Sequence, residues 1–211
     1  MHNLAQNWLN KYGGVLVSNN ELSVELADFS SSHDKLASLV RKGELIRLKQ
    51  GAYCVAPEVS GIEIDKFAIA NRLYGPSYVS FESALAHYGL IPERVVETMS
   101  AVDCRGKRYQ TPIGRFSYIT IPQEVFAVGI TSACGAVCNR LIANRTKALC
   151  DLLYARRHLR IVSAKGLRTF LTDDLRLDID EFGDFDASVI DAFVHSGRKC
   201  AIFESLKEMV Q

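Results

Sequence analysis

Between residues 30 and 55 the pattern of apolar positions changes from a helical period to that of β-strands. Leu36, Leu39 and Val40 are spaced so that they share one face of a helix. Two apolar runs follow, and the Gln50-Gly51 pair between them is typical of a tight turn. The segment therefore predicts a short helix followed by a β-hairpin.

The predicted helix carries signals at both ends. Ser31 or Ser32 begins it, because a serine hydroxyl accepts a hydrogen bond from the free N–H groups of the first turn. Asp34 follows Ser31 by three residues, which is close to the spacing of a capping box. Gly43 is placed to end the helix in a left-handed conformation.

The rest of the chain alternates between helical and β-rich patterns. Two further helices are expected before this segment, at residues 4–12 and from 18 or 19 to 26, and a linker is expected at 57–61. Helices are then expected at 62–74, 82–88, 144–159, 165–171, 187–196 and 201–210. Strands are expected at 78–80, 95–102, 116–121, 126–131 and 136–142, with a basic, turn-rich segment between the second and third of them.

These elements define the expected fold class, which is α+β. Three helices followed by a hairpin form the layout of a winged helix-turn-helix, in which the third helix enters the major groove of DNA. We expect this domain at residues 1–58. Residues 59–211 are expected to form a mixed α+β domain with a helical end.

Composition agrees with a folded protein of this kind. The 211 residues are 48% hydrophobic and 23% charged, which predicts a packed core. No apolar run is long enough to cross a bilayer, and the N-terminus lacks the apolar core of a signal peptide. We therefore expect a cytoplasmic protein with no membrane partner.

Charge is uneven along the chain although the formal net charge is only +1, so any nucleic-acid contact has to come from a local patch. Residues 35–49 hold five basic residues and one acid, and residues 140–168 hold eight basic residues and one acid. Residues 173–191 hold eight acids and one arginine. Blocks of opposite sign predict a basic and an acidic face, or an internal pairing of the two.

The first basic block lies on the predicted helix and hairpin, and we expect it to contact double-stranded DNA. Residues near the start of the helix are candidates for base contacts, and those farther along are candidates for phosphate contacts, which set affinity and register. The candidates are Ser31, Ser32, His33, Lys35, Ser38, Arg41, Lys42, Arg47, Lys49 and Gln50. The alternatives are an ordinary solvated helix and hairpin, or a winged helix that docks on proteins.

The second basic block is a further candidate for binding DNA or RNA. Its arginines are Arg140, Arg145, Arg156, Arg157 and Arg160. The alternative, which the sequence favours about equally, is a solvated basic face balanced by the acids of 173–191.

Other polar residues of the second domain have structural interpretations. Lys147 and Asp151 are four residues apart and are expected to pair on a helix surface. Ser80 is expected to cap the helix that follows it.

Three segments resemble the AbiEi family of antitoxins from abortive-infection, type IV toxin–antitoxin systems. They are LVRKGELIRLKQGAYCV at 39–55, GPSYVSFESALAHYGLIPE at 75–93 and IANRTKALCDLLYARRH at 142–158. The chain departs from the family pattern before Lys147, where Asn144, Arg145 and Thr146 replace the usual proline-glutamate, and between Gly14 and Ser30, which is longer and more acidic.

The resemblance implies two roles in phage defence. The N-terminal domain would bind operator DNA and repress its own operon, with a homodimer left open by the sequence. The second domain would counteract a cognate nucleotidyltransferase-like toxin, for which the family does not require a direct contact.

No enzyme is expected. A DNA-binding nuclease is the rival class, but its nearest candidates, Glu97, Asp103 and Lys107, fit no strong pattern. Cys134 and Cys138 are expected to be buried, inert thiols, because zinc sites usually need four ligands in closer paired spacings. We therefore expect no metal and no cofactor.

Overall fold

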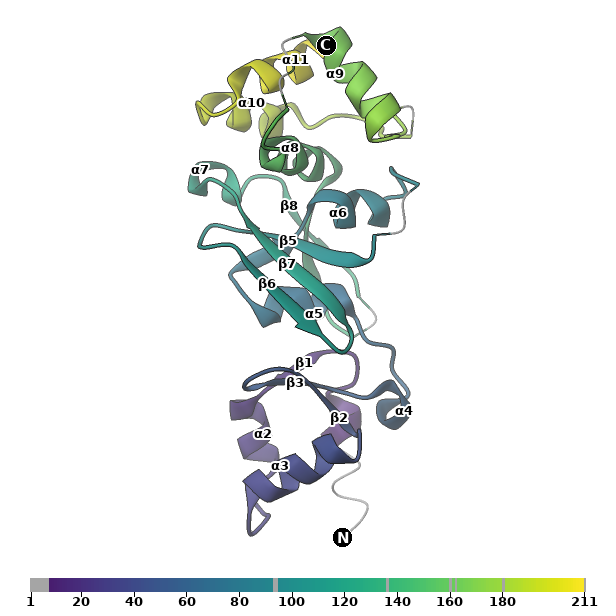
Figure 1. Cartoon of the computed structure of the whole chain (residues 1–211), viewed down its shortest axis with the longest axis vertical. Coiled ribbons are helices and arrows are strands. Elements are labelled where there is room, and N and C mark those ends of the chain that lie inside the picture. The colour runs from purple at the N-terminus through teal and green to yellow at the C-terminus, as the bar shows by residue number, and fades with distance from the viewer. Residues whose placement is uncertain are drawn as a thin grey trace.

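The fold is mixed α+β, with helices and sheets stacked in layers along the longest axis of the molecule (Figure 1). The computed structural model describes residues 8–210 apart from 93, 94, 136, 160, 162 and 180. Two helices lie at one end, followed by a small sheet, a helix, a larger sheet and a helical end (Figure 1). In the described part of the chain no helix has the length and apolar character needed to cross a membrane.

Residues 8–55, which we call the N-terminal unit, pack helical segments on a three-stranded antiparallel sheet with β3 in the centre. Residues 8–11 are helical, and residues 4–7 of that predicted helix lie outside the described residues. The elements that follow are β1 (Leu16–Ser18), α2 (Asn19–Glu25), α3 (Ser32–Arg41), β2 (Leu45–Lys49) and β3 (Ala52–Val55). The predicted α3 and hairpin are confirmed, whereas β1 was missed because three residues carry too short a pattern.

Both faces of this small sheet are covered. Val17 and Tyr53 face the helices of the N-terminal unit and pack in its own core. Leu16 and Cys54 belong instead to the core of the rest of the molecule. Successive side chains of a strand point to opposite faces, so every residue of β3 is buried. The continuous apolar run AYCV is therefore the pattern of a strand buried on both sides.

A six-stranded mixed sheet forms the centre of the remaining chain, in the order β6-β7-β5-β4-β9-β8. Parallel pairs join β5 to β7 and β4 to β9, and the other neighbours are antiparallel. Its strands are β4 (Ser77–Val79), β5 (Glu97–Val102), β6 (Lys107–Thr111), β7 (Gly114–Thr120), β8 (Ile130–Ala133) and β9 (Arg140–Ala143).

Helices cover both faces of this sheet (Figure 1). On the face toward the N-terminal unit, Ser77 and Tyr118 bond to the carbonyl oxygen of Ala70 in α5. On the opposite face, Tyr78 bonds to Asp151 in α8. The helices are α4 (Pro57–Ser60), α5 (Lys66–Leu73), α6 (Phe81–His87), α7 (Gln123–Phe126), α8 (Arg145–Ala155), α9 (Ala164–Thr169), α10 (Ala187–His195) and α11 (Cys200–Val210), with a π-helical turn η1 (Phe170–Asp174) after α9.

Several predicted elements differ from the structure. The basic segment expected to be a turn forms the edge strand β6, which pairs with β7. Its polar sequence lacks the apolar pattern of a strand, so the sequence did not predict it. The strand predicted at 126–131 is replaced by α7 and by β8 beginning at Ile130. The strand predicted from residue 136, which lies outside the described residues, begins at Arg140, and the linker contains α4.

Candidate nucleic-acid interface

α3 forms as the sequence predicts, and its caps hold it in place. The Ser31 hydroxyl accepts a hydrogen bond from the N–H of Asp34 at 3.3 Å. At the other end Gly43 has φ +74°, and the N–H of Glu44 reaches back to the carbonyl of Leu39 at 3.0 Å. This pattern closes the helix because glycine adopts the left-handed conformation without strain. Leu39 is buried in the core of the N-terminal unit, whereas His33, Ala37 and Arg41 on other faces of α3 are exposed.

The residues predicted to read bases lie at the N-cap and along α3 as far as Ser38, and they differ in availability. The Ser31 hydroxyl is engaged in the cap, and the Ser32 hydroxyl donates to the carbonyl of Leu26 at 3.0 Å. His33 is open, with 92% of its side chain exposed. The Lys35 ammonium lies 4.9 Å from the centre of the Phe29 ring. Ser38 is half-buried on the same helix.

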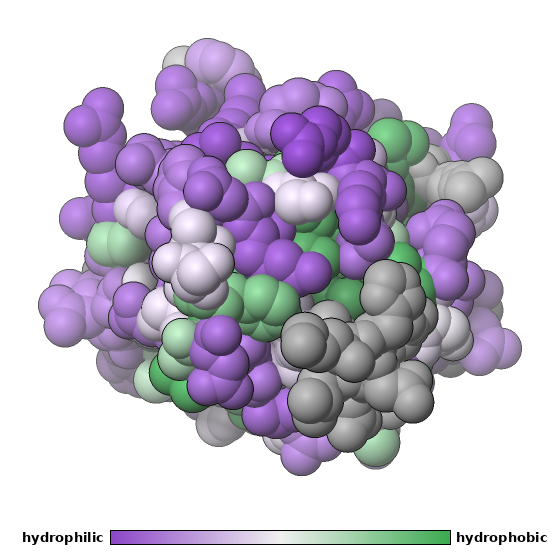
Figure 2. Space-filling view, turned by 90° about the horizontal axis from the view of Figure 1, so that it is seen from below, coloured by the Kyte–Doolittle hydropathy of each residue, from purple (hydrophilic) through white to green (hydrophobic). Residues whose placement is uncertain are grey.

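Among the residues predicted to hold phosphates, Arg41, Lys42 and Arg47 are exposed to solvent. Gln50 is also exposed, in the turn of the hairpin. Seen from the end that carries α2 and α3, most of the visible surface is hydrophilic (Figure 2). This end of the molecule can therefore present cations to a partner.

Lys49 does not lie where a free wing would place it. Its ammonium donates to the carbonyl of Leu73 at the end of α5 and sits 5.1 Å from the Tyr109 ring of β6. The small sheet packs on the rest of the molecule, and the Lys49 side chain lies in that junction and not on a free wing. Arg72 strengthens the junction through an ion pair with Glu21 at 2.7 Å.

The second predicted basic patch is not one patch. Arg145 donates to the carbonyls of Glu181 and Phe182 at 3.2 and 2.9 Å, and Arg156 pairs with Glu82 at 3.2 Å. Arg160 lies outside the described residues.

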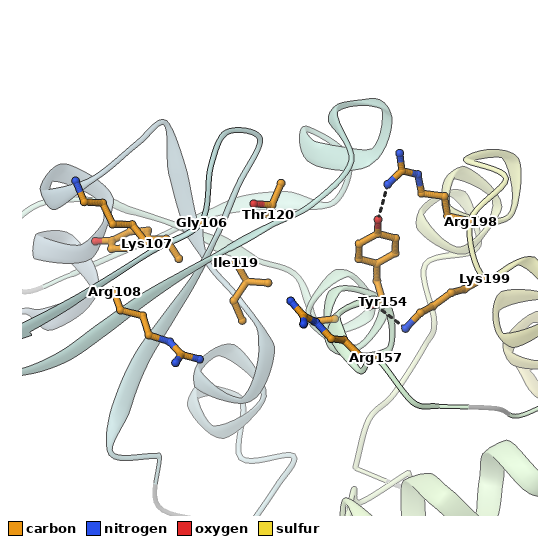
Figure 3. Close-up of a pocket in the computed structure, with 11 residues that line it drawn as sticks. Gly106, Lys107, Arg108, Ile119, Thr120, Tyr154, Arg157, Arg198 and Lys199 are labelled. Atoms are coloured by element: carbon orange, nitrogen blue, oxygen red, sulfur yellow. Dashed lines mark hydrogen bonds between the residues drawn. The ribbon is translucent and has the colours of Figure 1, made fainter.

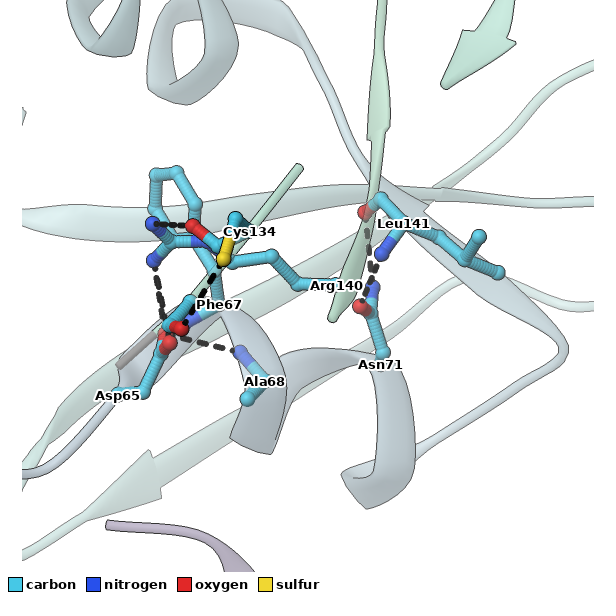
Figure 4. A network of polar contacts seen from close by, with 8 residues as sticks. Asp65, Phe67, Ala68, Asn71, Cys134, Arg140 and Leu141 are labelled. Atoms are coloured by element: carbon cyan, nitrogen blue, oxygen red, sulfur yellow. Dashed lines mark hydrogen bonds and ion pairs between the residues drawn. The ribbon is translucent and has the colours of Figure 1, made fainter. Parts of the chain in front are cut away.

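Arg140 of the same set has a structural role instead (Figure 4). It pairs with Asp65 at 3.0 Å, while Asp65 also accepts the N–H groups of Phe67 and Ala68 and so caps α5. Farther along α5, the Asn71 amide exchanges two hydrogen bonds with the backbone of Leu141, at 2.8 and 3.1 Å. These contacts fasten α5 to β9, which explains why Arg140 is not available to a ligand.

Arg157 is the member of that set that remains exposed near other cations. It lines a cleft together with Arg108 from β6 and Arg198 from the turn between α10 and α11 (Figure 3). These arginines are far apart in the sequence, so no local pattern joins them. The folding of the chain brings them together.

Lys147 and Asp151 are buried rather than on a helix surface. Both side chains have 0% exposure, and their charged atoms are 3.0 Å apart. Asp151 also accepts hydrogen bonds from Tyr78 at 2.9 Å and Ser80 at 2.7 Å, and Lys147 donates to the carbonyl of Val125 at 2.7 Å. Burial raises the pKa of the Asp151 carboxyl, and these partners oppose the rise.

This buried network also corrects the expected capping by Ser80. The residue is at the start of α6, but its hydroxyl points to Asp151 and not to the helix N–H groups. An i, i+4 lysine and aspartate have the same sequence pattern on a surface and in a core, so the sequence did not reveal the burial.

The remaining candidate chemistry is dispersed. Glu97 begins β5, Asp103 follows its far end, and Lys107 begins β6, so the three do not share one site. Cys134 and Cys138 are exposed, contrary to the expectation of buried thiols, because they lie beyond the paired part of the β8–β9 hairpin. The described residues contain no cluster of three or more histidine, cysteine or acidic side chains arranged to hold a metal ion.

Comparisons with known proteins show the fold alone. No family model matches the chain, and no curated protein matches it. Its structure is similar to the crystal structure of the RV2827C protein from Mycobacterium tuberculosis, with a TM-score of 0.62 and 11% sequence identity. The match covers 99% of this chain and 75% of that one.

Proposed function

We propose that the protein is a DNA-binding transcriptional repressor of its own operon, and that the N-terminal unit is a winged helix-turn-helix. The order of helix, β1, α2, α3, β2 and β3 is typical of that module. The observation that carries the proposal is the exposure of His33 and Arg41 on α3 together with that of Arg47 on the hairpin. α3 would enter the major groove, and the arginines would contact phosphates.

The placement of Lys49 limits how the hairpin takes part. Because its ammonium is held at the junction with α5 and β6, the proposed footprint consists of α3 and Arg47 and excludes Lys49. The N-terminal unit has six basic and five acidic residues over 8–55, so its sequence-independent electrostatic attraction to DNA phosphates is modest. Selectivity would then depend on base contacts, on DNA shape or on the pairing of two copies.

The test is a fluorescence-anisotropy titration of the full chain against the DNA upstream of its own gene and against a scrambled duplex, each at two salt concentrations. The proposal expects tighter, salt-sensitive binding to the native duplex. Equal binding to both duplexes would reduce the function to non-specific DNA attachment. If neither duplex binds, the winged helix is a protein-docking module instead.

We further propose that the protein acts as an antitoxin. The support is the AbiEi resemblance, whose second and third segments meet in one buried network: Tyr78 and Ser80 from one segment bond to Asp151 from the other. These three residues of the resembling segments lie in the core. The toxin contact, if the antitoxin acts through one, lies outside this network.

Co-expression with a nucleotidyltransferase-like protein encoded beside it tests the second role. We expect growth to be rescued by the full chain and equally by Arg41→Ala/Arg47→Ala, which retains the second domain but loses DNA contacts. Rescue that disappears in this variant would assign protection to repression alone. Absence of rescue by the full chain would remove the antitoxin role.

A further inference from the structure

A cleft of about 840 Å³ opens on the face of the large sheet that carries α8, at its β6 edge. It lies between the strands β6 and β7 on one side and the end of α8 with the α10–α11 turn on the other (Figure 3). Its size is within the range of small-molecule sites. It contains no residue of α3, so its function is independent of the one proposed for the N-terminal unit.

Three guanidinium groups define the charge of this cleft. Arg108 pairs in register with Ser117 of β7, so its side chain lies on the same sheet face as Ile119, two residues farther along β7. Arg157 reaches toward Ile119 from the end of α8 (Figure 3). Arg198 is held at the rim by a hydrogen bond from its guanidinium to the Tyr154 hydroxyl at 3.1 Å.

These guanidiniums have capacity for a ligand. Arg108 and Arg157 form no side-chain hydrogen bond or ion pair with any residue that the structure describes, and both are exposed. Arg198 uses one donor on Tyr154, and a guanidinium has five. No acidic side chain is among the described residues that line the cleft. The positive charge of the cleft is therefore not offset by any described lining residue, although the hydrogen bond to Tyr154 and the charge of Glu124 outside the lining raise the pKa of the Arg198 guanidinium.

The two lysines of the cleft have other tasks. The Lys199 ammonium donates to the carbonyls of Leu153, Tyr154 and Arg156, at 3.0, 2.7 and 2.6 Å, and so caps the C-terminal end of α8. The Lys107 ammonium lies 5.2 Å from the Tyr109 ring. Lys199 thus holds the end of α8, the Lys107 side chain lies on the opposite face of the sheet beside Tyr109, and the arginines are left for recognition.

Between the arginines the cleft is apolar. Ile119 lies between Arg108 and Arg157, and Tyr154 and Ala155 continue the surface along α8 (Figure 3). Guanidiniums around a flat apolar strip suit a ligand that has phosphates and a planar base, since arginine binds phosphate oxygens in pairs and bases pack on aromatic or apolar faces.

We propose that this cleft binds a phosphorylated nucleotide, with its phosphates on Arg108, Arg157 and Arg198 and its base on the strip of Ile119 and Tyr154. The nucleotide is either free, as a nucleoside triphosphate, or part of single-stranded RNA. Both sources present the same chemistry to the cleft.

The test measures binding of fluorescently labelled ATP and of a labelled single-stranded oligoadenylate to the full chain. Unlabelled competitors are inorganic triphosphate, poly-glutamate and a scrambled DNA duplex. Arg108→Gln/Arg157→Gln is expected to weaken binding by roughly 10-fold or more, because two charged hydrogen-bond donors are lost. The matched control, Lys165→Gln/Arg168→Gln, removes the same charge from exposed positions on α9 and should bind as the wild type does.

The outcomes separate the sources and decide the proposal. Binding of ATP alone assigns a free nucleotide, and binding of the oligoadenylate alone assigns RNA. ATP should compete better than inorganic triphosphate, since the base adds contact with the strip. The proposal is overturned if neither probe binds, if poly-glutamate competes as well as ATP, or if the control variant loses as much affinity.

Failure here is distinguishable from failure of the repressor proposal. A loss in Arg108→Gln/Arg157→Gln that is confined to duplex DNA would overturn the nucleotide site and make the cleft an extension of the DNA footprint. Because these side chains have no structural partners among the described residues, both variants should keep the far-UV circular dichroism spectrum and the thermal midpoint of the wild type. A loss of binding in a variant that keeps both is then not caused by unfolding.

Discussion

The exposed cations around α3 and the buried cation of α8 carry the same charge in opposite surroundings. Arg41 and Arg47 face solvent, where a partner can reach them. The Lys147 side chain has 0% exposure, and its ammonium lies 3.0 Å from the Asp151 carboxylate. That carboxylate also accepts hydrogen bonds from the hydroxyls of Tyr78 and Ser80. The difference teaches that cations in this chain divide into a set that is satisfied within the fold and a set that is available outside it.

The largest effect is expected in the satisfied set. Asp151→Ala leaves the Lys147 ammonium buried without its counter-charge, which costs about 3–5 kcal/mol in the free energy of unfolding. The Tyr78 and Ser80 hydroxyls also lose their acceptor. Chemical denaturation monitored by circular dichroism measures the change.

A paired replacement sharpens this prediction. Lys147→Met combined with Asp151→Ala removes both charges and should recover part of the lost stability, because no buried charge is left without its counter-charge. The recovery stays incomplete because the Tyr78 and Ser80 hydroxyls still lack their acceptor. If Asp151→Ala alone changes the free energy of unfolding by under about 1 kcal/mol, the pair does not stabilise the core in the way described.

The available set should respond in binding and not in stability. Arg41→Ala/Arg47→Ala is expected to weaken DNA binding on every sequence and to lower the slope of log affinity against log salt by about 2, as two phosphate contacts are lost. Anisotropy titrations over a salt series measure it. Lys165→Ala/Arg168→Ala on α9 is the control. An equal loss of DNA affinity in that variant would show that Arg41 and Arg47 act only through the net charge of the protein and not through contacts with phosphates.

A smaller effect is expected where the two units meet. Glu21 closes the cap of α2 with Ser18 and pairs with Arg72 at 2.7 Å. Burial raises the pKa of the Glu21 carboxyl, but the hydrogen bonds from Ser18 and Arg72 outweigh it, and the net pKa is lowered. Glu21→Gln should cost about 1 kcal/mol in the free energy of unfolding, as expected for a weakened cap.

The same carboxyl predicts a pH dependence with a definite sign. A folded pKa below the ordinary value of 4.5 gives a stabilisation that is complete above that value and is lost as the pH falls through the folded pKa. The wild type should therefore lose more stability than Glu21→Gln below about pH 4.5. Urea titrations at several pH values test this, with Glu204→Gln on exposed α11 as the reference. Parallel curves for wild type and Glu21→Gln would contradict it.

The smallest effect on affinity is expected at His33. His33→Ala should cost up to about 1 kcal/mol on the preferred duplex, the range of a single hydrogen bond, and less on the scrambled one. The measurement is the ratio of the two dissociation constants. An equal loss on both duplexes would move His33 from base contacts to phosphate contacts.

Local features were predictable from the sequence because they depend on neighbouring residues. The Ser31 cap, the end of α3 at Gly43 and the turn at Gln50-Gly51 follow from side-chain chemistry within one helical turn or one hairpin. The mixed α+β class followed from the alternation of such patterns.

What depends on distant parts of the chain was not predictable. The cleft joins Arg108, Arg157 and Arg198 from three separate elements, and no spacing connects them. The position of Lys49 at the junction required knowing that the hairpin packs on α5 and β6. Long-range packing determines both the cleft and the position of Lys49. The local sequence pattern would be the same if these side chains faced solvent separately.

The two-sided burial of β3 has a mechanical consequence. Its side chains pack in the core that contains α3 on one face and in the core that contains α5 and the larger sheet on the other, so the strand belongs to both cores. A movement that shifts β3 would therefore displace α3 with it, because the two elements share one core. Binding of a ligand at one end of the molecule would then change the orientation of α3 at the other end.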